Sequence, residues 1–138
     1  MTKPLRLLAL GSLLFGLTFG ASSLGTAQEA LSVASVAMGN ALERGRPVEA
    51  KTSFGQSEGR LYVVVQLQNP SGAETTVRVM IRQAGGRGHG GVTLDVPARR
   101  RYRTVARFST QQAPGSYEAV VLNAAGEVIS TTAFTITS

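Results

Sequence analysis

Apolar and polar side chains alternate over much of the chain after residue 60, and a period of two is typical of half-buried β-strands. In residues 60–68 every second side chain is apolar, which predicts one buried face made of Leu61, Val63, Val65 and Leu67. Residues 74–82 repeat the pattern, with apolar side chains inward and Arg78 and Arg82 outward. The sequence Asn69-Pro70-Ser71-Gly72 between them is typical of a tight turn, so we expect the two strands to form a hairpin.

Four later segments also read as strands: residues 92–96, 101–108, 117–122 and 127–137. The apolar run over residues 31–38 alternates less clearly, and a first strand is favoured there over a short helix. Pro47 fits an edge or a crossover better than a central strand. About seven strands, with turn signals roughly every 8 to 12 residues and no helix long enough to cross over a parallel sheet, predict an all-β, antiparallel β-sandwich.

The first 27 residues have a different character. Lys3 and Arg6 precede an apolar run over residues 7–19, which is shorter than the roughly 20 residues that a membrane-spanning helix needs. Small residues follow, and Gly25-Thr26-Ala27 offers a cleavage site. We therefore expect a cleavable signal peptide over residues 1–27 and a mature domain over residues 28–138, located in the periplasm or outside the cell. An uncleaved membrane anchor is the alternative.

Composition agrees with one small exported domain. The chain has 138 residues, enough for a single core, and 16 glycines, which favour strands and turns over helices. Cysteine is absent, which excludes a disulfide framework, a thiolate metal site and a lipid-modified cysteine. Removal of residues 1–27 would take away two cations and lower the formal net charge from +6 to +4.

Residues 113–119, Ala-Pro-Gly-Ser-Tyr-Glu-Ala, resemble the corner before the penultimate strand of immunoglobulin-like domains, where a glycine precedes a tyrosine by two. In that family the tyrosine hydroxyl binds upstream backbone, which implies this role for Tyr117. Residues 115–137 also resemble the last hairpin of bacterial immunoglobulin-like modules, with Gly126 at the turn, and are similar to small uncharacterised exported envelope proteins. The resemblance implies a disulfide-free immunoglobulin-like β-sandwich and no particular activity.

Two motifs look like catalytic or cofactor chemistry. Gly55-Gln56-Ser57-Glu58-Gly59 matches the G-x-S-x-G pattern of serine hydrolases, but a strand follows it where those enzymes have a helix. A triad would have to use His89 and Asp95, the one histidine and one aspartate of the mature chain. Residues 86–91 fit G-x-G-x-x-G, again without the helix that meets a pyrophosphate. We therefore expect no enzyme, no cofactor and no metal site, with a small serine esterase using Ser57 as the remote alternative.

Arginine occupies five of the nine positions in residues 99–107. Alternation sends Arg101, Arg103 and Arg107 to one outward face, which Arg78 and Arg82 would extend if the sheets bring them near. The sequence favours a solvated edge that blocks aggregation, and the alternative is an anion-binding face for phosphorylated or carboxylated envelope polymers. Nucleic acid is disfavoured, because the outward faces lack aromatic platforms for bases.

The function that these observations favour is that of a non-enzymatic, exported β-sandwich module with a structural, accessory or interaction role in the cell envelope. Its expected partner is an envelope protein or an anionic polymer, and no stable membrane span is expected after signal cleavage. Polyanion binding through the arginine-rich sheet face is the main alternative function.

Overall fold

Seven strands of at least five residues form two β-sheets in the computed structural model, which describes residues 30–86 and 91–138. The three-stranded sheet has the order β1-β5-β8, with the bounds β1 Ser32–Gly39, β5 Arg60–Gln68 and β8 Arg101–Ser109. The five-stranded sheet has the order β4-β10-β9-β6-β7, with the bounds β4 Ser53–Gly55, β6 Thr75–Gln83, β7 Val92–Val96, β9 Gly115–Leu122 and β10 Val128–Thr137. Neighbouring strands are antiparallel except β4 and β10, which run parallel. The described part of the chain is therefore all-β, as predicted.

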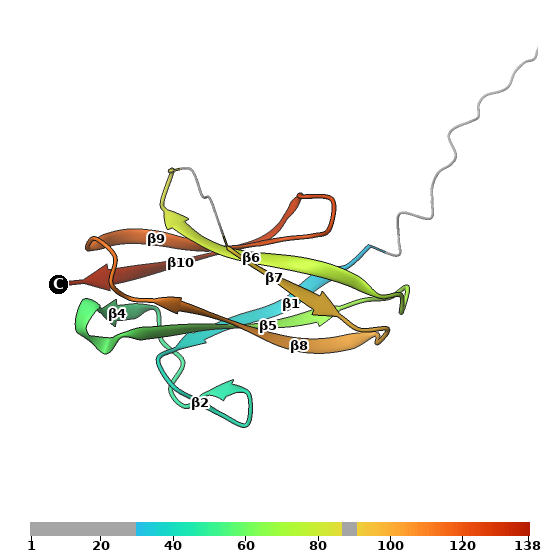
Figure 1. The fold of residues 1–138 in the computed structure, drawn as a ribbon, viewed down its shortest axis with the longest axis horizontal. Coiled ribbons are helices and arrows are strands. Elements are labelled where there is room, and N and C mark those ends of the chain that lie inside the picture. The colour runs from blue at the N-terminus through green and yellow to red at the C-terminus, as the bar shows by residue number, and fades with distance from the viewer. Residues whose placement is uncertain (1–29, 87–90) are drawn as a thin grey trace, which may run out of the picture. The chain divides into compact units, whose positions relative to one another are not determined.

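The two sheets lie one above the other, with β6, β7, β9 and β10 in the upper layer of Figure 1 and β1, β5 and β8 in the lower layer. Residues 31–38 form a strand, β1, as favoured from the sequence, and β9 and β10 form the predicted hairpin. Residues 31–138 make one compact unit. The predicted signal peptide over residues 1–27, and its cleavage after Ala27, lie outside the described residues.

One apolar core holds the two layers together, and the predicted alternation supplies it. The inward side chains of β5 are buried, as are those from the five-stranded sheet that share the core with them: Phe54, Val77, Val79, Val96, Tyr117, Ala119, Val121, Phe134 and Ile136. The Phe134 ring is stacked on Tyr117, with centroids 5.7 Å apart, and meets Phe54 edge-on at 6.2 Å. Each aromatic pair of this kind adds about 1 kcal/mol beyond the burial of its surface.

The predicted hairpin between residues 60–68 and 74–82 is wrong. These segments are β5 and β6, which belong to different sheets, so the chain crosses from one layer to the other at residues 69–72. The turn has the expected chemistry, since Gly72 has a φ of +67° and the Asn69 side-chain amide donates to the Ala73 carbonyl at 2.8 Å. However, the Asn69 backbone N–H donates to the carbonyl oxygen of Arg100, 2.7 Å away. The turn is thereby tied to the start of β8, which replaces β6 as the neighbour of β5.

Between β1 and β4 the chain forms a two-stranded hairpin that was not predicted as such, made of β2 (Leu42–Glu43) and β3 (Arg46–Pro47). Pro47 thus occupies a short edge strand, in agreement with its expected position. Both loop residues have positive φ angles, +54° at Arg44 and +75° at Gly45, as a two-residue type I′ turn requires. The hairpin lies below the three-stranded sheet in Figure 1.

Candidate anion-binding surface

The outer face of β8 carries the three arginines that alternation places together. Thr104 and Ala106 are buried on the inner face, so Arg101, Arg103 and Arg107 project from the opposite side. Arg101 and Arg107 are exposed, and Arg103 is half-buried. Two neighbours predicted to point inward, Tyr102 and Phe108, are only partly buried because β8 is an edge strand, although both pack against the core.

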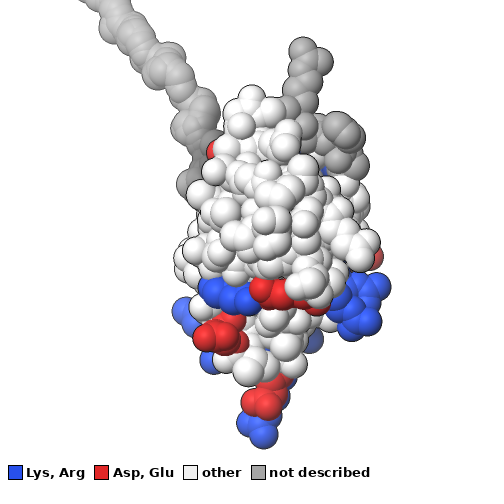
Figure 2. All heavy atoms as spheres, turned by 90° about the vertical axis from the view of Figure 1, so that its left-hand side faces the viewer, with Lys and Arg blue, Asp and Glu red and all other residues white. Residues whose placement is uncertain are grey.

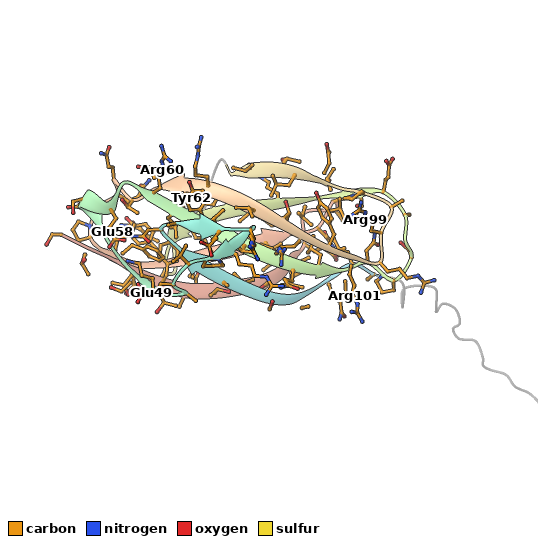
Figure 3. The ribbon with its side chains drawn as sticks, turned by 90° about the horizontal axis from the view of Figure 1, so that it is seen from below. Glu49, Glu58, Arg60, Tyr62, Arg99 and Arg101 are labelled. Atoms are coloured by element: carbon orange, nitrogen blue, oxygen red, sulfur yellow. The ribbon has the colours of Figure 1, made fainter. Side chains whose placement is uncertain are left out.

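The register of β8 with β5 brings polar side chains beside these arginines. Arg101 lies opposite Gln68, Arg103 opposite Gln66, and Arg107 opposite Tyr62. Figure 3 views the molecule from below, with Arg101 near one end of the strands and Tyr62 toward the other. Guanidinium groups therefore alternate with carboxamides at the Arg101 end of this face, and not at the Arg107 end.

None of these three guanidinium groups lies within ion-pair distance of a carboxylate of residues 30–86 or 91–138. The ion pairs seen there are Lys51–Glu58 at 2.7 Å and Arg82–Glu118 at 3.0 Å. Cations without an acidic partner retain their full capacity to bind an anion. The electrostatics of this face therefore fit an anionic ligand.

The other two arginines of the candidate set do not join this face. Arg78 and Arg82 point outward from β6, in the five-stranded sheet, so they lie on the opposite side of the core. The Arg82 guanidinium is bound to Glu118 of β9, and the Arg78 side chain lies beside Gly91. The expected extension depended on β6 being the neighbour of β5, and the crossover at residues 69–72 removes it.

The β2–β3 hairpin instead supplies two cations that the sequence reasoning did not connect with β8. A hollow of about 520 Å³ is lined by Glu43, Arg44, Arg46, Pro47, Val48 and Arg103. The Arg103 guanidinium lies against the hairpin tip, since its Nε is 3.6 Å from the position that a Cβ atom on Gly45 would occupy. Three guanidinium groups and one carboxylate thus line one recess.

A second hollow, of about 320 Å³, lies on the same outer face. Its lining includes Gln66 and Gln68 of β5, Arg101 and Arg103 of β8, and Ala34, which occupies the irregular position in the pairing of β1 with β5. Arg103 belongs to both hollows, and Arg107 to neither. Figure 2 shows that charged side chains gather in the lower part of that view, where the hairpin lies, while the upper part is mostly uncharged.

The serine motif has a structural role in the described part of the chain. Residues 56–58 form one 3₁₀ turn, η4 (Gln56–Glu58), before β5 begins, and the Ser57 side chain is exposed. No hydrogen bond joins Ser57 to Asp95, which lies on β7, and His89 is outside the described residues. Within residues 30–86 and 91–138 the motif is therefore part of a turn that leads into β5.

Glu58 and Thr110 fasten this turn to its surroundings. The Glu58 carboxylate accepts hydrogen bonds from Lys51 Nζ, Asn40 Nδ2 and the Gly55 backbone N–H, each at 2.7 Å. The hydrogen bond from Lys51, followed by that from Gly55, lowers the pKa of Glu58 below its ordinary value of 4.5. The Thr110 hydroxyl, fully buried, donates to the carbonyl oxygen of residue 56 at 3.0 Å and accepts from the N–H of residue 59 at 2.8 Å.

Within the described ranges, no three His, Asp or Glu side chains cluster in a way that would hold a metal ion. The same ranges contain no helix that is long and apolar enough to cross a membrane.

No family model and no curated protein matches the chain. Solved structures do resemble it. A β-glucosidase from Listeria innocua in complex with glucose has a TM-score of 0.51 and 11% identity over 79% of this chain. β-Glucosidase 3B from Thermotoga neapolitana, in complex with glycerol, has a TM-score of 0.52 and 11% identity over 80% of this chain.

This chain spans only 16% of the length of either glucosidase chain. At such low identity the likeness shows the fold alone. The β-sheet arrangement of this chain therefore also occurs as a small part of much larger proteins.

Proposed function

We propose that this chain is an exported, non-enzymatic β-sandwich module of the immunoglobulin-like type, which acts as a structural, accessory or interaction domain in the cell envelope. The observation that carries the proposal is the coverage of its structural neighbours: its fold matches 16% of each of two enzyme chains. A fold that recurs as a minor part of larger proteins is typical of a module that serves a partner.

The strand order supports the immunoglobulin-like assignment. The first, second and fifth long strands, β1, β5 and β8, share one sheet, and the third, sixth and seventh, β6, β9 and β10, share the other. In immunoglobulin-like sandwiches too, the first, second and fifth strands share one sheet and the third, sixth and seventh share the other. The fourth long strand, β7, departs from the constant-type pattern, because it pairs with β6 instead of joining the sheet of β1, β5 and β8. The Tyr117 hydroxyl, near the start of the penultimate strand, donates to the Ala113 carbonyl at 2.7 Å, and this bond supports the proposal because it resembles the tyrosine corner of that family.

Enzyme assays test the non-enzymatic part of the proposal. The protein is purified after export by a bacterial host and incubated with an aryl ester and with an aryl β-glucoside. We expect no turnover above that of buffer. Hydrolysis of the ester that disappears in Ser57→Ala would overturn the proposal in favour of a serine esterase, and hydrolysis of the glucoside by homogeneous protein would overturn it as well.

Fractionation tests the location. We expect the protein outside the cytoplasm, sedimenting with isolated cell envelopes under conditions in which a soluble periplasmic marker does not. Recovery of the whole amount from the cytoplasm would contradict the export that the first 27 residues predict.

A second candidate function is polyanion binding by the outer face of β8. It is favoured by the three outward guanidinium groups that lack an acidic partner in the described part of the chain. Retention on a heparin-type matrix should fall steeply with salt. Unchanged retention after replacing Arg101, Arg103 and Arg107 together by glutamine would exclude this function.

A further inference from the structure

The geometry points to a binding groove for an acidic polysaccharide, formed between the β2–β3 hairpin and the outer face of β5 and β8 and centred on Arg103. This inference deepens the polyanion-binding function and rests on it. The groove is defined by Arg44 and Arg46 of the hairpin, Arg101 and Arg103 of β8, and Gln66 and Gln68 of β5. Glu43 also lines its hairpin end, where three guanidinium groups outnumber this one carboxylate.

The two hollows of this face meet at one side chain. Arg103 lines both the recess of about 520 Å³ under the hairpin and the recess of about 320 Å³ beside Gln66 and Gln68. The hairpin packs onto the same face, because a Cβ atom on Gly39 of β1 would lie 2.9 Å from Pro47 Cβ. Val64, whose side chain points to this face from β5, is accordingly only 3% exposed. The surface is thus a channel beside a raised hairpin, and a channel suits a thread-like polymer better than a flat membrane surface.

The residues of the groove match the chemistry of an acidic sugar chain. Guanidinium groups bind carboxylate, sulfate or phosphate groups in a planar fork. Carboxamides both donate and accept hydrogen bonds, as sugar hydroxyl groups do. Arg101 and Arg103 are two residues apart on one strand, so their Cα atoms are about 7 Å apart and present two separate charges along the groove. A polymer that carries repeated anions on a hydroxyl-rich chain satisfies both kinds of side chain.

The hairpin tip carries backbone strain because a residue that its type I′ turn places at a positive φ is an arginine. Arg44 has a φ of +54°, in the left-handed region that is unfavourable for residues other than glycine, asparagine and aspartate. Type I′ turns prefer asparagine at this position. Arginine at this position, against the local preference, adds a guanidinium group to the recess that Arg46 and Arg103 also line. Strain that persists at such a position indicates a functional use of the side chain.

The test compares single variants of the exported protein in calorimetric titrations with an oligogalacturonate at low salt. Arg103→Gln should weaken binding about tenfold, as expected when a charge-assisted contact is lost. Arg44→Asn should weaken binding several-fold while its melting temperature stays equal to or above that of the wild type, because asparagine suits the turn. Arg107→Gln removes the same charge from the same strand outside the groove and should change the affinity less than twofold.

Three results would overturn the groove. The first is an equal loss of affinity in Arg107→Gln and Arg103→Gln, which would leave general polyanion binding by β8 intact. The second is equal binding of polyphosphate of the same charge, since polyphosphate has no sugar hydroxyl groups to engage Gln66 and Gln68. The third is undiminished binding of the fully methyl-esterified oligogalacturonate, which has lost its charge. A sulfated oligosaccharide that binds with the same order among the variants would support the groove equally, because the shared chemistry is that of an acidic glycan.

Discussion

The Tyr117 hydroxyl allows one stability prediction to be worked out closely. Tyr117 is 5% exposed, its ring is stacked on Phe134, and its hydroxyl donates to the Ala113 carbonyl at 2.7 Å. Tyr117→Phe removes the hydroxyl and leaves the ring, so the burial and the stacking are retained. The lost hydrogen bond is worth about 1 kcal/mol of unfolding free energy, because Ala113 is exposed and its carbonyl can bind water instead.

Two further variants serve as controls for this loss of about 1 kcal/mol. Tyr117→Ala also deletes the buried ring and should cost about 4 kcal/mol, the usual loss for a large aromatic residue in a core. Tyr62→Phe makes the same chemical change on the outer face, where the Tyr62 hydroxyl has no hydrogen bond to another described residue, and should leave the stability nearly unchanged.

Urea unfolding followed by circular dichroism measures all three. A loss of about 1 kcal/mol lowers the melting temperature of a domain of this size by about 4 °C. The urea slope should stay constant, since the surface exposed on unfolding is the same. If Tyr117→Phe is as stable as Tyr62→Phe, the hydroxyl does not tie the loop to the strand. If it is as unstable as Tyr117→Ala, the hydrogen bond is not a separable contribution.

Three further predictions concern other parts of the chain. Thr110→Val keeps the volume of the buried side chain but loses two hydrogen bonds, and should lower the free energy of unfolding in urea by about 2 kcal/mol. Thr110→Ser loses only a methyl group and should lower it by about 1 kcal/mol. Equal losses in the two variants would refute the role of the hydroxyl. The pKa of Glu58 is lowered in the folded state, so its contribution to stability is present above pH 4.5 and is lost as the pH falls through the folded value. In thermal unfolding at a series of acidic pH values, the melting temperature should therefore decline less steeply in Glu58→Gln than in the wild type. Parallel curves for the two proteins would contradict this. The intact mass of the exported protein should correspond to a chain beginning at Gln28, and a mass that includes residues 1–27 would mean a retained anchor.

Side-chain alternation predicts the inner faces of this protein well because burial on one face of a strand is a local property. Leu61, Val63, Val65 and Leu67 are all buried, and the arginines of β8 point outward. Val64 is also buried, on the outer face of β5. The β2–β3 hairpin packs over that face near Gly39, and the alternation within residues 60–68 does not report which segment covers the face.

Strand pairing is not local, and the wrong hairpin shows why. The turn at residues 69–72 has the composition of a hairpin turn, and the same composition serves a crossover between two sheets. What decides between them is the pairing of β5 with β8, which the Asn69 backbone N–H extends by donating to Arg100, a residue 31 positions later. No pattern within residues 60–82 reports that contact. The misplacement of Arg78 and Arg82 follows directly from it.

The candidate site is predictable in its β8 half and not in its hairpin half. Arg101, Arg103 and Arg107 stand out because they alternate on a strand of nine residues. The hairpin strands have two residues each, too few for alternation to be recognised. Its turn has Arg44 where Asn-Gly or Asp-Gly would have been a clear signal. The pair Arg44-Gly45 between Glu43 and Arg46 was the available hint.

The same arginines also suit a solubilising role, and the two roles differ in what they demand of each residue. Protection of the exposed edge of β8 needs only charge, so any cation on that strand would serve, Arg107 included. It does not account for Arg103, a half-buried residue whose guanidinium lies against Gly45 and which lines two hollows at once. Nor does it account for Arg44, which holds an unfavourable φ where asparagine would relieve it. Arg44 and Arg103, which a solubilising role leaves unexplained, both line the groove. Arg107, which that role does explain, lies outside it.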